Sequence, residues 1–338
     1  LMLRYRAKLF KQGRVSWINR RITETDKNGK LGCNFSTVVN SALKEKKFVR
    51  PIMGTVLGIH EEAALPTFEN QRLTEKAVSQ SLKIDSSAPG NGRKVALFAT
   101  CFSEYNNNKI GMMARAVLAK NGVETEVVYP MCCGMPQLEQ GDIDRVASHA
   151  EKSSMELIKW IDQGYDIVSL VPSCTLMLKF EWPLILPRNE NIKKLSQATF
   201  DIAEYIMDIS KKEGLSEGMS PIGDITLHIS CHSRAQNMGQ KGAEMLRQIP
   251  DTKVNIIERC SGHGGSWGVM ADNFEIALKI GKPVARKVSS ELTKNIVSEC
   301  PLAREHIVQG VQKISEEKPL TINSAQHPIE LLAAAYGI

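Results

Sequence analysis

The chain has 338 residues, of which 42% are hydrophobic and 24% are charged, the balance of an ordinary globular protein with room for two domains. No run approaches the roughly 20 uncharged apolar residues of a membrane-spanning helix, and the basic opening LMLRYRAKLFKQGR lacks the apolar stretch of a secretory signal. We therefore expect neither a transmembrane protein nor a secreted one. We expect a cytoplasmic protein, either free or peripheral to the inner membrane.

The first unit expected along the chain is residues 1–85, a mostly helical basic region that ends in a linker. Residues 1–50 contain 13 Lys or Arg and 3 Asp or Glu, so this part is far more basic than the total charge of +6. Such a segment suits anionic lipid, an acidic protein or plain solvent. Aromatic residues are not interleaved with the basic ones, so no nucleic-acid partner is expected. A turn is predicted at Asp26–Gly29, and Cys33 is interpreted as a plain thiol.

The second expected unit, residues 93–218, contains strands that lead into cysteines. A predicted helix over 108–121 separates the first two strands, and a longer helical region precedes the third. The cysteines at these strand ends are Cys101 after KVALFAT, Cys132 and Cys133 after TEVVYP, and Cys174 after YDIVSLVPS.

The third expected unit, residues 222–338, repeats the second. Its cysteines are Cys231 after ITLHIS, Cys260 after VNIIER and Cys300 after KNIVSE. The first two cysteines are 31 residues apart in one copy and 29 in the other, and the copies are offset by about 130 residues, far more than a solenoid repeat. The pattern therefore indicates a duplicated domain.

The order strand–helix–strand–helix–strand predicts an α/β fold with a parallel sheet in each copy. Right-handed crossovers bring the carboxyl ends of parallel strands to one edge of the sheet, where ligands bind in such folds. Because each repeated cysteine follows a predicted strand, thiols distant in sequence should meet at that edge.

Four thiolates at one edge suit an iron–sulfur cluster. The adjacent Cys132 and Cys133 can both take part if the backbone turns sharply after them, and Gly134 and Pro136 favour such a turn. We therefore predict a cluster, of the 4Fe–4S type, on Cys101, Cys132, Cys133 and Cys174. A zinc ion on the same thiolates is the competing interpretation, and four buried free cysteines are the plainest one.

The second copy departs from the first, because Ser261 stands where the first copy has Cys133. The predicted ligands there are Cys231, Cys260, Cys300 and His263. These residues suit an iron–sulfur cluster or zinc, and a vestigial site kept for packing is the alternative. Near them, His232 is interpreted as a structural residue or a hydrogen-bond donor to a cluster sulfur, and Arg234 as a group that compensates thiolate charge.

The motifs around these cysteines resemble the CCG-domain (cysteine-rich) family of iron–sulfur proteins. The resemblance is carried by CFSEYNNNKIG, CCGMPQLEQGD, GYDIVSLVPSCTLMLKFEWP, CHSRAQNMG, CSGHGGSWG and HPIELLAAAYG, and it covers the chain from about residue 50. Within the family, the sequence is most similar to proteins like the C subunit of anaerobic glycerol-3-phosphate dehydrogenase and the B subunit of heterodisulfide reductase. The fold that this resemblance implies is two pseudo-symmetric parallel-sheet CCG domains behind the helical N-terminal region.

The resemblance also implies an electron-transfer subunit of an oxidoreductase, working with a flavoprotein dehydrogenase or another carrier such as membrane quinone. A rubrerythrin-like protein is the alternative redox partner. Family members often carry an N-terminal ferredoxin segment, and the basic opening looks like the stretch that follows one. The non-cubane clusters of the heterodisulfide reductase family members use a fifth cysteine, where this chain has Met177 and Ala303. A heterodisulfide or peroxide reductase with its own metal site, and a zinc-filled scaffold, remain the alternative functions; no catalytic residue is assigned.

Overall fold

Two parallel β-sheets form the frame of the protein. The structure is a computed structural model that describes residues 2–45, 47–291, 293, 295–315 and 325–338. The first sheet has the order β2-β1-β3-β4 and consists of β1 (Lys94–Phe98), β2 (Glu124–Val128), β3 (Asp166–Ser169) and β4 (Thr199–Asp201). The second has the order β6-β5-β7 and consists of β5 (Ile225–His228), β6 (Val254–Ile257) and β7 (Asn295–Ser298). Every pair of neighbouring strands is parallel, which confirms the predicted α/β class.

The two sheets share one topology. In each, the first strand in sequence is central, with the second strand on one side and the third on the other. This common order is what a duplicated domain produces. The first sheet also has a fourth strand, β4, which the sequence analysis did not predict.

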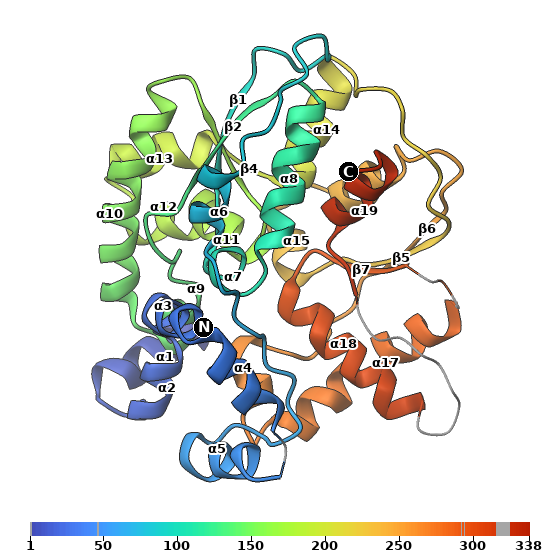
Figure 1. The fold of residues 1–338 in the computed structure, drawn as a ribbon. Coiled ribbons are helices and arrows are strands. Elements are labelled where there is room, and N and C mark those ends of the chain that lie inside the picture. The colour runs from blue at the N-terminus through green and yellow to red at the C-terminus, as the bar shows by residue number, and fades with distance from the viewer. Residues whose placement is uncertain (1, 46, 292, 294, 316–324) are drawn as a thin grey trace.

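Helices fill the space between the sheets and cover their outer faces (Figure 1). The layer between the sheets contains α8 (Asn108–Lys120), α14 (Ile202–Lys212), α16 (Lys241–Leu246) and α19 (Pro328–Ala335). The outer face of the first sheet is covered by α10 (Ile143–Ile161) and α13 (Glu190–Gln197). The outer face of the second is covered by α17 (Phe274–Glu291) and α18 (Pro301–Ile314).

Alternate residues of the strands pack into different cores, because successive side chains of a strand point to opposite faces. Val95 and Leu97 of β1 enter the core between the sheets, whereas Ala96 and Phe98 enter the outer core with α10 and α13. Strands buried on both faces read as continuous apolar runs such as VALF, which is how they could be predicted. The shared core packs the two repeated units against each other.

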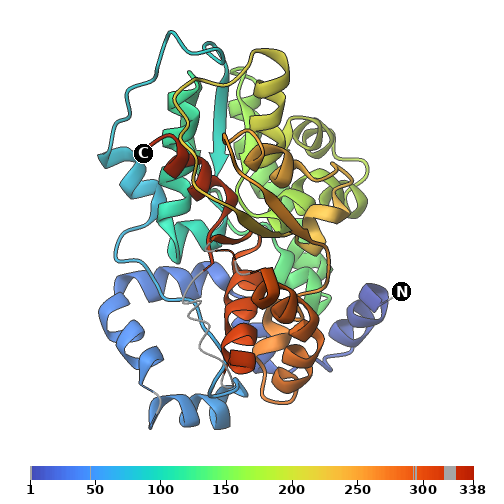
Figure 2. The ribbon, with the colours of Figure 1, turned by 90° about the vertical axis from the view of Figure 1, so that its right-hand side faces the viewer.

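The N-terminal helices lie in the lower half of the molecule in both ribbon views (Figure 1 and Figure 2). They are α1 (Met2–Lys11), α2 (Trp17–Ile22), α3 (Thr25–Asn34), α4 (Ser36–Lys44) and α5 (Val49–Leu57), followed by α6 (Leu73–Ser79). The predicted turn at Asp26–Gly29 is wrong, since α3 runs through it. Gly29 packs so closely on the Tyr105 ring that a Cβ would overlap it, so this glycine serves packing and does not end the helix.

Short helices at the strand ends complete the fold, and three of them carry a cysteine: Cys101, Cys174 and Cys231. They are α7 (Cys101–Tyr105), α9 (Met135–Gln140), α11 (Pro172–Leu176), the π-helix η1 (Met177–Glu181), α12 (Trp182–Ile185), α15 (Cys231–Ala235) and the 3₁₀ helix η2 (Gly265–Val269). Five-residue helices such as α7 and α15 hold a cysteine at a fixed place directly after a strand.

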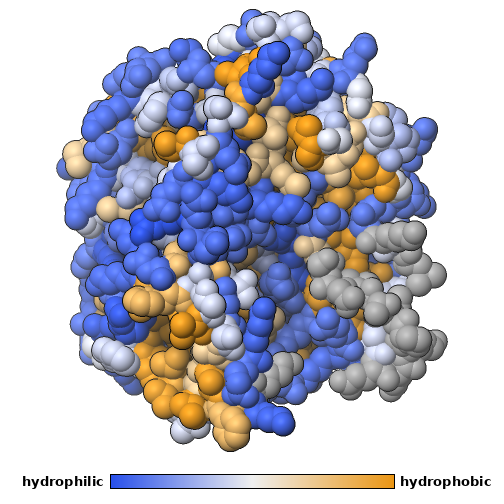
Figure 3. All heavy atoms as spheres, in the orientation of Figure 1, coloured by the Kyte–Doolittle hydropathy of each residue, from blue (hydrophilic) through white to orange (hydrophobic). Residues whose placement is uncertain are grey.

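An apolar patch lies on the surface formed by α4 and α5 (Figure 3). Phe48, Ile52 and Val56 are 73%, 62% and 60% exposed, and they follow one another at the four-residue spacing of a helix face. These side chains contribute little to the core of the chain. Within the described residues, no helix combines the length and the apolar character needed to span a bilayer.

Candidate metal centre

The carboxyl ends of β1, β2 and β3 bring four cysteines to one edge of the first sheet. Cys101 begins α7, Cys132 and Cys133 lie in the loop after β2, and Cys174 lies in α11 after β3. Cys132, Cys133 and Cys174 are 1%, 2% and 4% exposed, so water is largely excluded from their sulfurs. The expected convergence of these thiols is therefore present.

The turn at Cys132 and Cys133 is fixed by partners for its backbone. Gly134 has a φ of +87°, which a residue with a Cβ rarely adopts, and the chain then enters α9. The Cys132 amide donates to Asp26 Oδ2 at 3.0 Å, and its carbonyl accepts from His149 Nδ1 at 3.1 Å. The Cys133 carbonyl accepts from Trp182 Nε1 at 2.9 Å. Buried backbone groups need such partners, so these hydrogen bonds fix the shape of the loop.

The four sulfurs are close neighbours. Cys133 Sγ lies 3.2 Å from Cys174 Sγ, and the Gly134 amide lies 3.5 Å from Cys132 Sγ. Hydrogen bonds from the Cys101 and Cys133 thiols lower the pKa of Cys132 well below its usual value. The same interactions, with burial, raise the pKa of Cys101 and Cys133 well above theirs. The chain alone thus favours one thiolate among thiols, and a bound cation is needed for further thiols to ionise together.

The four cysteine sulfurs suit a sulfur-rich metal group, and the buried Thr25 hydroxyl supports this interpretation. Thr25 Oγ1 is inaccessible to solvent, has no hydrogen-bond partner of standard geometry among the described residues, and lies beside the Cys132 sulfur. Such a hydroxyl can donate to a sulfur that carries negative charge. Over the described residues, no three His, Cys, Asp or Glu side chains are arranged around a position for a single metal ion.

The second sheet presents its cysteines differently. Cys300 is buried, and its sulfur lies 3.8 Å from His263 Nε2. His263 Nδ1 pairs with Ser261 Oγ at 3.0 Å, so the residue that replaces a cysteine here orients the imidazole. Burial lowers the pKa of His263 to about 4, which keeps the ring neutral at pH 7 and able to bind a metal.

The remaining residues predicted for the second site stand further apart. Cys231 and Cys260 are exposed, and the contact described for Cys231 is with Arg234, 3.7 Å from its sulfur. Burial lowers the pKa of His232, with the nearby His263 adding to the shift. The structure thus brings Cys300 and His263 together, with no described contact from Cys231 or Cys260 to that pair.

The two sites face each other across the units. Helices α11 and α15, which carry Cys174 and Cys231, pack together, and Gln236 Nε2 donates to the carbonyl of Pro172 at 3.3 Å. Glu139 of α9 lies against the loop at Gly265, where a Cβ would overlap its carboxyl group. Burial raises the pKa of Glu139 to about 7, and the nearby His263 and Arg6 oppose this shift.

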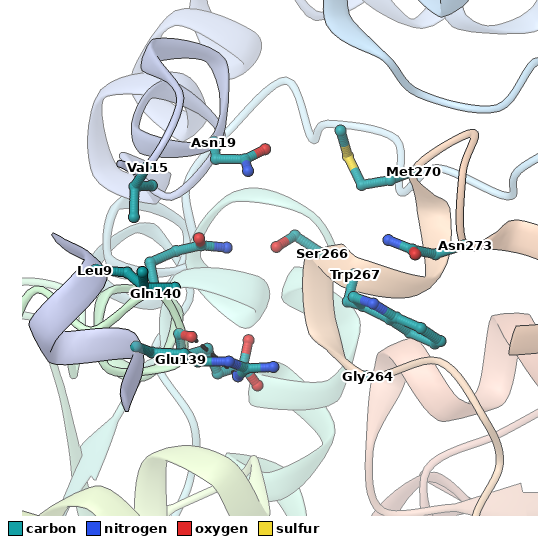
Figure 4. Close-up of a pocket in the computed structure, with 11 residues that line it drawn as sticks. Leu9, Val15, Asn19, Glu139, Gln140, Gly264, Ser266, Trp267, Met270 and Asn273 are labelled. Carbon is teal, nitrogen blue, oxygen red and sulfur yellow. Dashed lines mark hydrogen bonds between the residues drawn. The ribbon is translucent and has the colours of Figure 1, made fainter. Parts of the chain in front are cut away.

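A cavity of about 490 Å³ opens beside this contact, between the N-terminal helices, α9 and η2 (Figure 4). Figure 4 shows Glu139 and Gln140 on one side, opposite Ser266 and Trp267. The cavity is lined by Arg6, Leu9, Val15, Asn19, Glu139, Gln140, Gly264, Ser266, Trp267, Met270 and Asn273. Its wall combines apolar side chains with amide and charged groups, the make-up of small-molecule sites.

Several residues around the first site were not identified from the sequence. Asp26, Thr25 and His149 contact the Cys132 turn, but they lie far from it in the chain, and no local pattern marks them. Trp182 was interpreted as a packing residue, whereas its indole also holds the Cys133 carbonyl. Cys33 agrees with its interpretation as a plain thiol: it is buried, donates to the Tyr105 carbonyl, and burial raises its pKa to about 11.

Comparison with known proteins finds a family match and several relatives of this chain. Residues 95–179 match the family described as "Cysteine-rich domain", CCG. The C subunit of anaerobic glycerol-3-phosphate dehydrogenase from Escherichia coli K12 is 24% identical over 99% of this chain and 81% of its own length. The B subunit of fumarate reductase (CoM/CoB) from Methanothermobacter marburgensis is 27% identical over 75% of this chain and 49% of its own. Lactate utilization protein A of Bacillus pumilus is 28% identical over 52% of this chain and 75% of its own.

The matched residues contain β1 to β3 and all four cysteines of the first site. The match and the first sheet's geometry thus mark the same part of the chain. Residues 95–179 are thus similar to the CCG cysteine-rich domain, and the relatives of the chain include iron–sulfur proteins.

Proposed function

We propose that this chain is an iron–sulfur electron-transfer subunit of an oxidoreductase, with its cluster held by Cys101, Cys132, Cys133 and Cys174. The observation that carries the proposal is the convergence of these buried thiols from three strand ends. Relatives named as subunits of a glycerol-3-phosphate dehydrogenase and a fumarate reductase support it. A bound cluster supplies one-electron transfer between a redox partner, such as a flavoprotein, and a second carrier.

The role of the chain itself is to hold and shield the thiolates. The backbone partners of Cys132 and Cys133 fix the turn before any metal binds, which lowers the ordering cost of binding. The burial of three of the four thiols limits the access of water and oxidants. In the second half, the neutral His263 beside Cys300 offers a nitrogen and a sulfur to a cluster or to zinc.

The experiment is iron, sulfide and zinc analysis with electron paramagnetic resonance on anaerobically prepared protein. We expect iron and sulfide together, and a paramagnetic signal in one redox state. Cys132→Ser should abolish that signal, whereas Cys33→Ser, the matched change of a buried cysteine outside the site, should leave it intact. A colourless wild-type protein with zinc alone would refute the proposal and favour a zinc scaffold.

A reductase acting on a disulfide or peroxide is the second candidate, and the cavity beside Glu139 favours it. The missing fifth cysteines speak against it. Their positions are taken by Met177 and Ala303, whose side chains are fully buried in the core and carry no thiol. Turnover of a disulfide or a peroxide with an artificial electron donor would identify this activity. Its absence from protein with a full cluster content leaves the electron-transfer subunit.

A further inference from the structure

Four consecutive residues at the junction of α2 and α3, Thr23–Asp26, contact the turn that carries Cys132 or the helices α9 and α10 that follow it. The Thr23 carbonyl accepts from Gln137 Nε2 at 2.6 Å, and Glu24 Oε1 accepts from Arg145 at 3.4 Å. Asp26 accepts from the Cys132 amide and from the Tyr129 hydroxyl. These contacts cross more than 100 residues of sequence, so they tie the N-terminal region to the first site.

Within this segment, the side chain of Thr25 lies beside the sulfur of Cys132. Its Oγ1 is buried and unpartnered within the described part of the chain. A buried hydroxyl without a partner costs free energy unless a neighbouring group supplies the acceptor. The Cys132 sulfur is the neighbouring acceptor, and it accepts better as a thiolate on a metal than as a thiol.

We propose that residues 23–26 are a positioning segment of the first site, in which the Thr25 hydroxyl donates to the Cys132 sulfur and Asp26 holds the Cys132 amide. The inference rests on the proposed function, because it concerns the same four thiolates. It assigns two residues of the N-terminal helical region, outside the repeated units, to the surroundings of the cluster.

The two side chains should act on the reduction potential in opposite directions. A donor to a ligand sulfur stabilises the more negative, reduced cluster, so its loss lowers the potential. A carboxylate near the cluster destabilises the reduced form, so its neutralisation raises the potential. A residue that only supported the fold would not produce shifts of opposite sign.

The test is a redox titration of the cluster signal in the full-length protein, with four variants. We expect Thr25→Val to lower the reduced-to-oxidised ratio at a fixed potential about tenfold, which corresponds to about 59 mV for one electron. Thr25→Ser keeps the hydroxyl and should titrate like the wild type. Asp26→Asn should raise the ratio. Thr37→Val, on the exposed surface of α4, is the matched control and should change nothing.

Equal potentials for wild type, Thr25→Val and Asp26→Asn would overturn the inference while leaving the electron-transfer function standing. An equal shift in Thr37→Val would also overturn it. Should Thr25→Val bind no iron, Thr25→Ser and Asp26→Asn decide: an unchanged potential in Asp26→Asn refutes the inference. A wild-type protein without a cluster would overturn both this inference and the proposed function.

Discussion

Trp182 offers a direct measure of how much a single side chain holds the cysteine turn in place. It is 0% exposed, follows the π-helix η1, and donates its indole N–H to the carbonyl of Cys133 at 2.9 Å. Trp182→Phe removes this donor and keeps an aromatic ring in the core. Trp17→Phe makes the same chemical change on α2, where the side chain is 71% exposed.

The expected loss of stability in Trp182→Phe has two parts. Leaving the buried Cys133 carbonyl unpaired costs about 1–3 kcal/mol. The smaller ring leaves a cavity, which we take as about 1–2 kcal/mol because full truncation of a buried Trp to Ala costs about 3–5 kcal/mol. The free energy of unfolding should therefore fall by about 2–5 kcal/mol. Trp17→Phe should change it by less than about 0.5 kcal/mol, as exposed substitutions do.

Urea unfolding of the metal-free proteins, followed by far-ultraviolet circular dichroism, measures this difference. The rate of iron loss to a chelator measures the effect on the site, and it should rise at least tenfold in Trp182→Phe, since outer-shell partners typically change metal affinity by about 10–100-fold. A Trp182→Phe protein as stable as Trp17→Phe would refute the reasoning. So would lost stability combined with unchanged iron retention, because the turn would then not depend on the indole.

Three further predictions concern the glycine turn, a buried histidine and the second site. Gly134→Ala should lose iron faster than the wild type, because alanine is strained at the φ of +87° that this turn requires. The control is Gly164→Ala, at a φ of +85° and with no neighbouring atoms, which should lose about 1 kcal/mol of stability and keep its iron. Burial lowers the pKa of His327 to about 3, so the unfolded chain takes up a proton at higher pH than the folded protein does. The free energy of unfolding should therefore fall as the pH drops from about 6.5 towards 3. His327→Gln should flatten this fall when the free energy of unfolding is measured across the range. Cys300→Ser should lower the total metal content and leave the first-site paramagnetic signal unchanged; loss of that signal would show one shared site.

The fold could be predicted because its strands are buried on both faces. Runs such as KVALF and DIVS have few alternatives to a central parallel strand, and each was followed by a chemically distinctive cysteine. β4 was missed because three residues, Thr199–Asp201, are too few to show a pattern. The turn predicted at Asp26–Gly29 was wrong because packing of Gly29 on Tyr105 outweighs the local turn preference of the sequence.

The convergence of the four first-site cysteines was predicted residue by residue, whereas their surroundings were not, and no described contact joins Cys231 or Cys260 to Cys300, where one was expected. Strand ends converge by topology, which the sequence order encodes, whereas Asp26 reaches Cys132 across 106 positions through tertiary packing alone. His149 is marked only by its place on an amphipathic helix, where a core role is equally compatible. Residues that hold the ligands of a metal site in place without binding the metal are therefore hard to predict from one sequence.

The difference in exposure between the two sites indicates where a redox partner of the proposed relay docks. In the first site, three sulfurs are nearly inaccessible, so a partner protein cannot approach them closely. In the second half, Cys231 and Cys260 reach the surface, and Arg234 beside Cys231 adds a positive charge there. The two halves adjoin through α11 and α15, the helices that carry Cys174 and Cys231. We therefore expect a partner of the proposed relay to dock over the second half, and charge substitutions at Arg234 should slow electron delivery to the first site without changing its iron content.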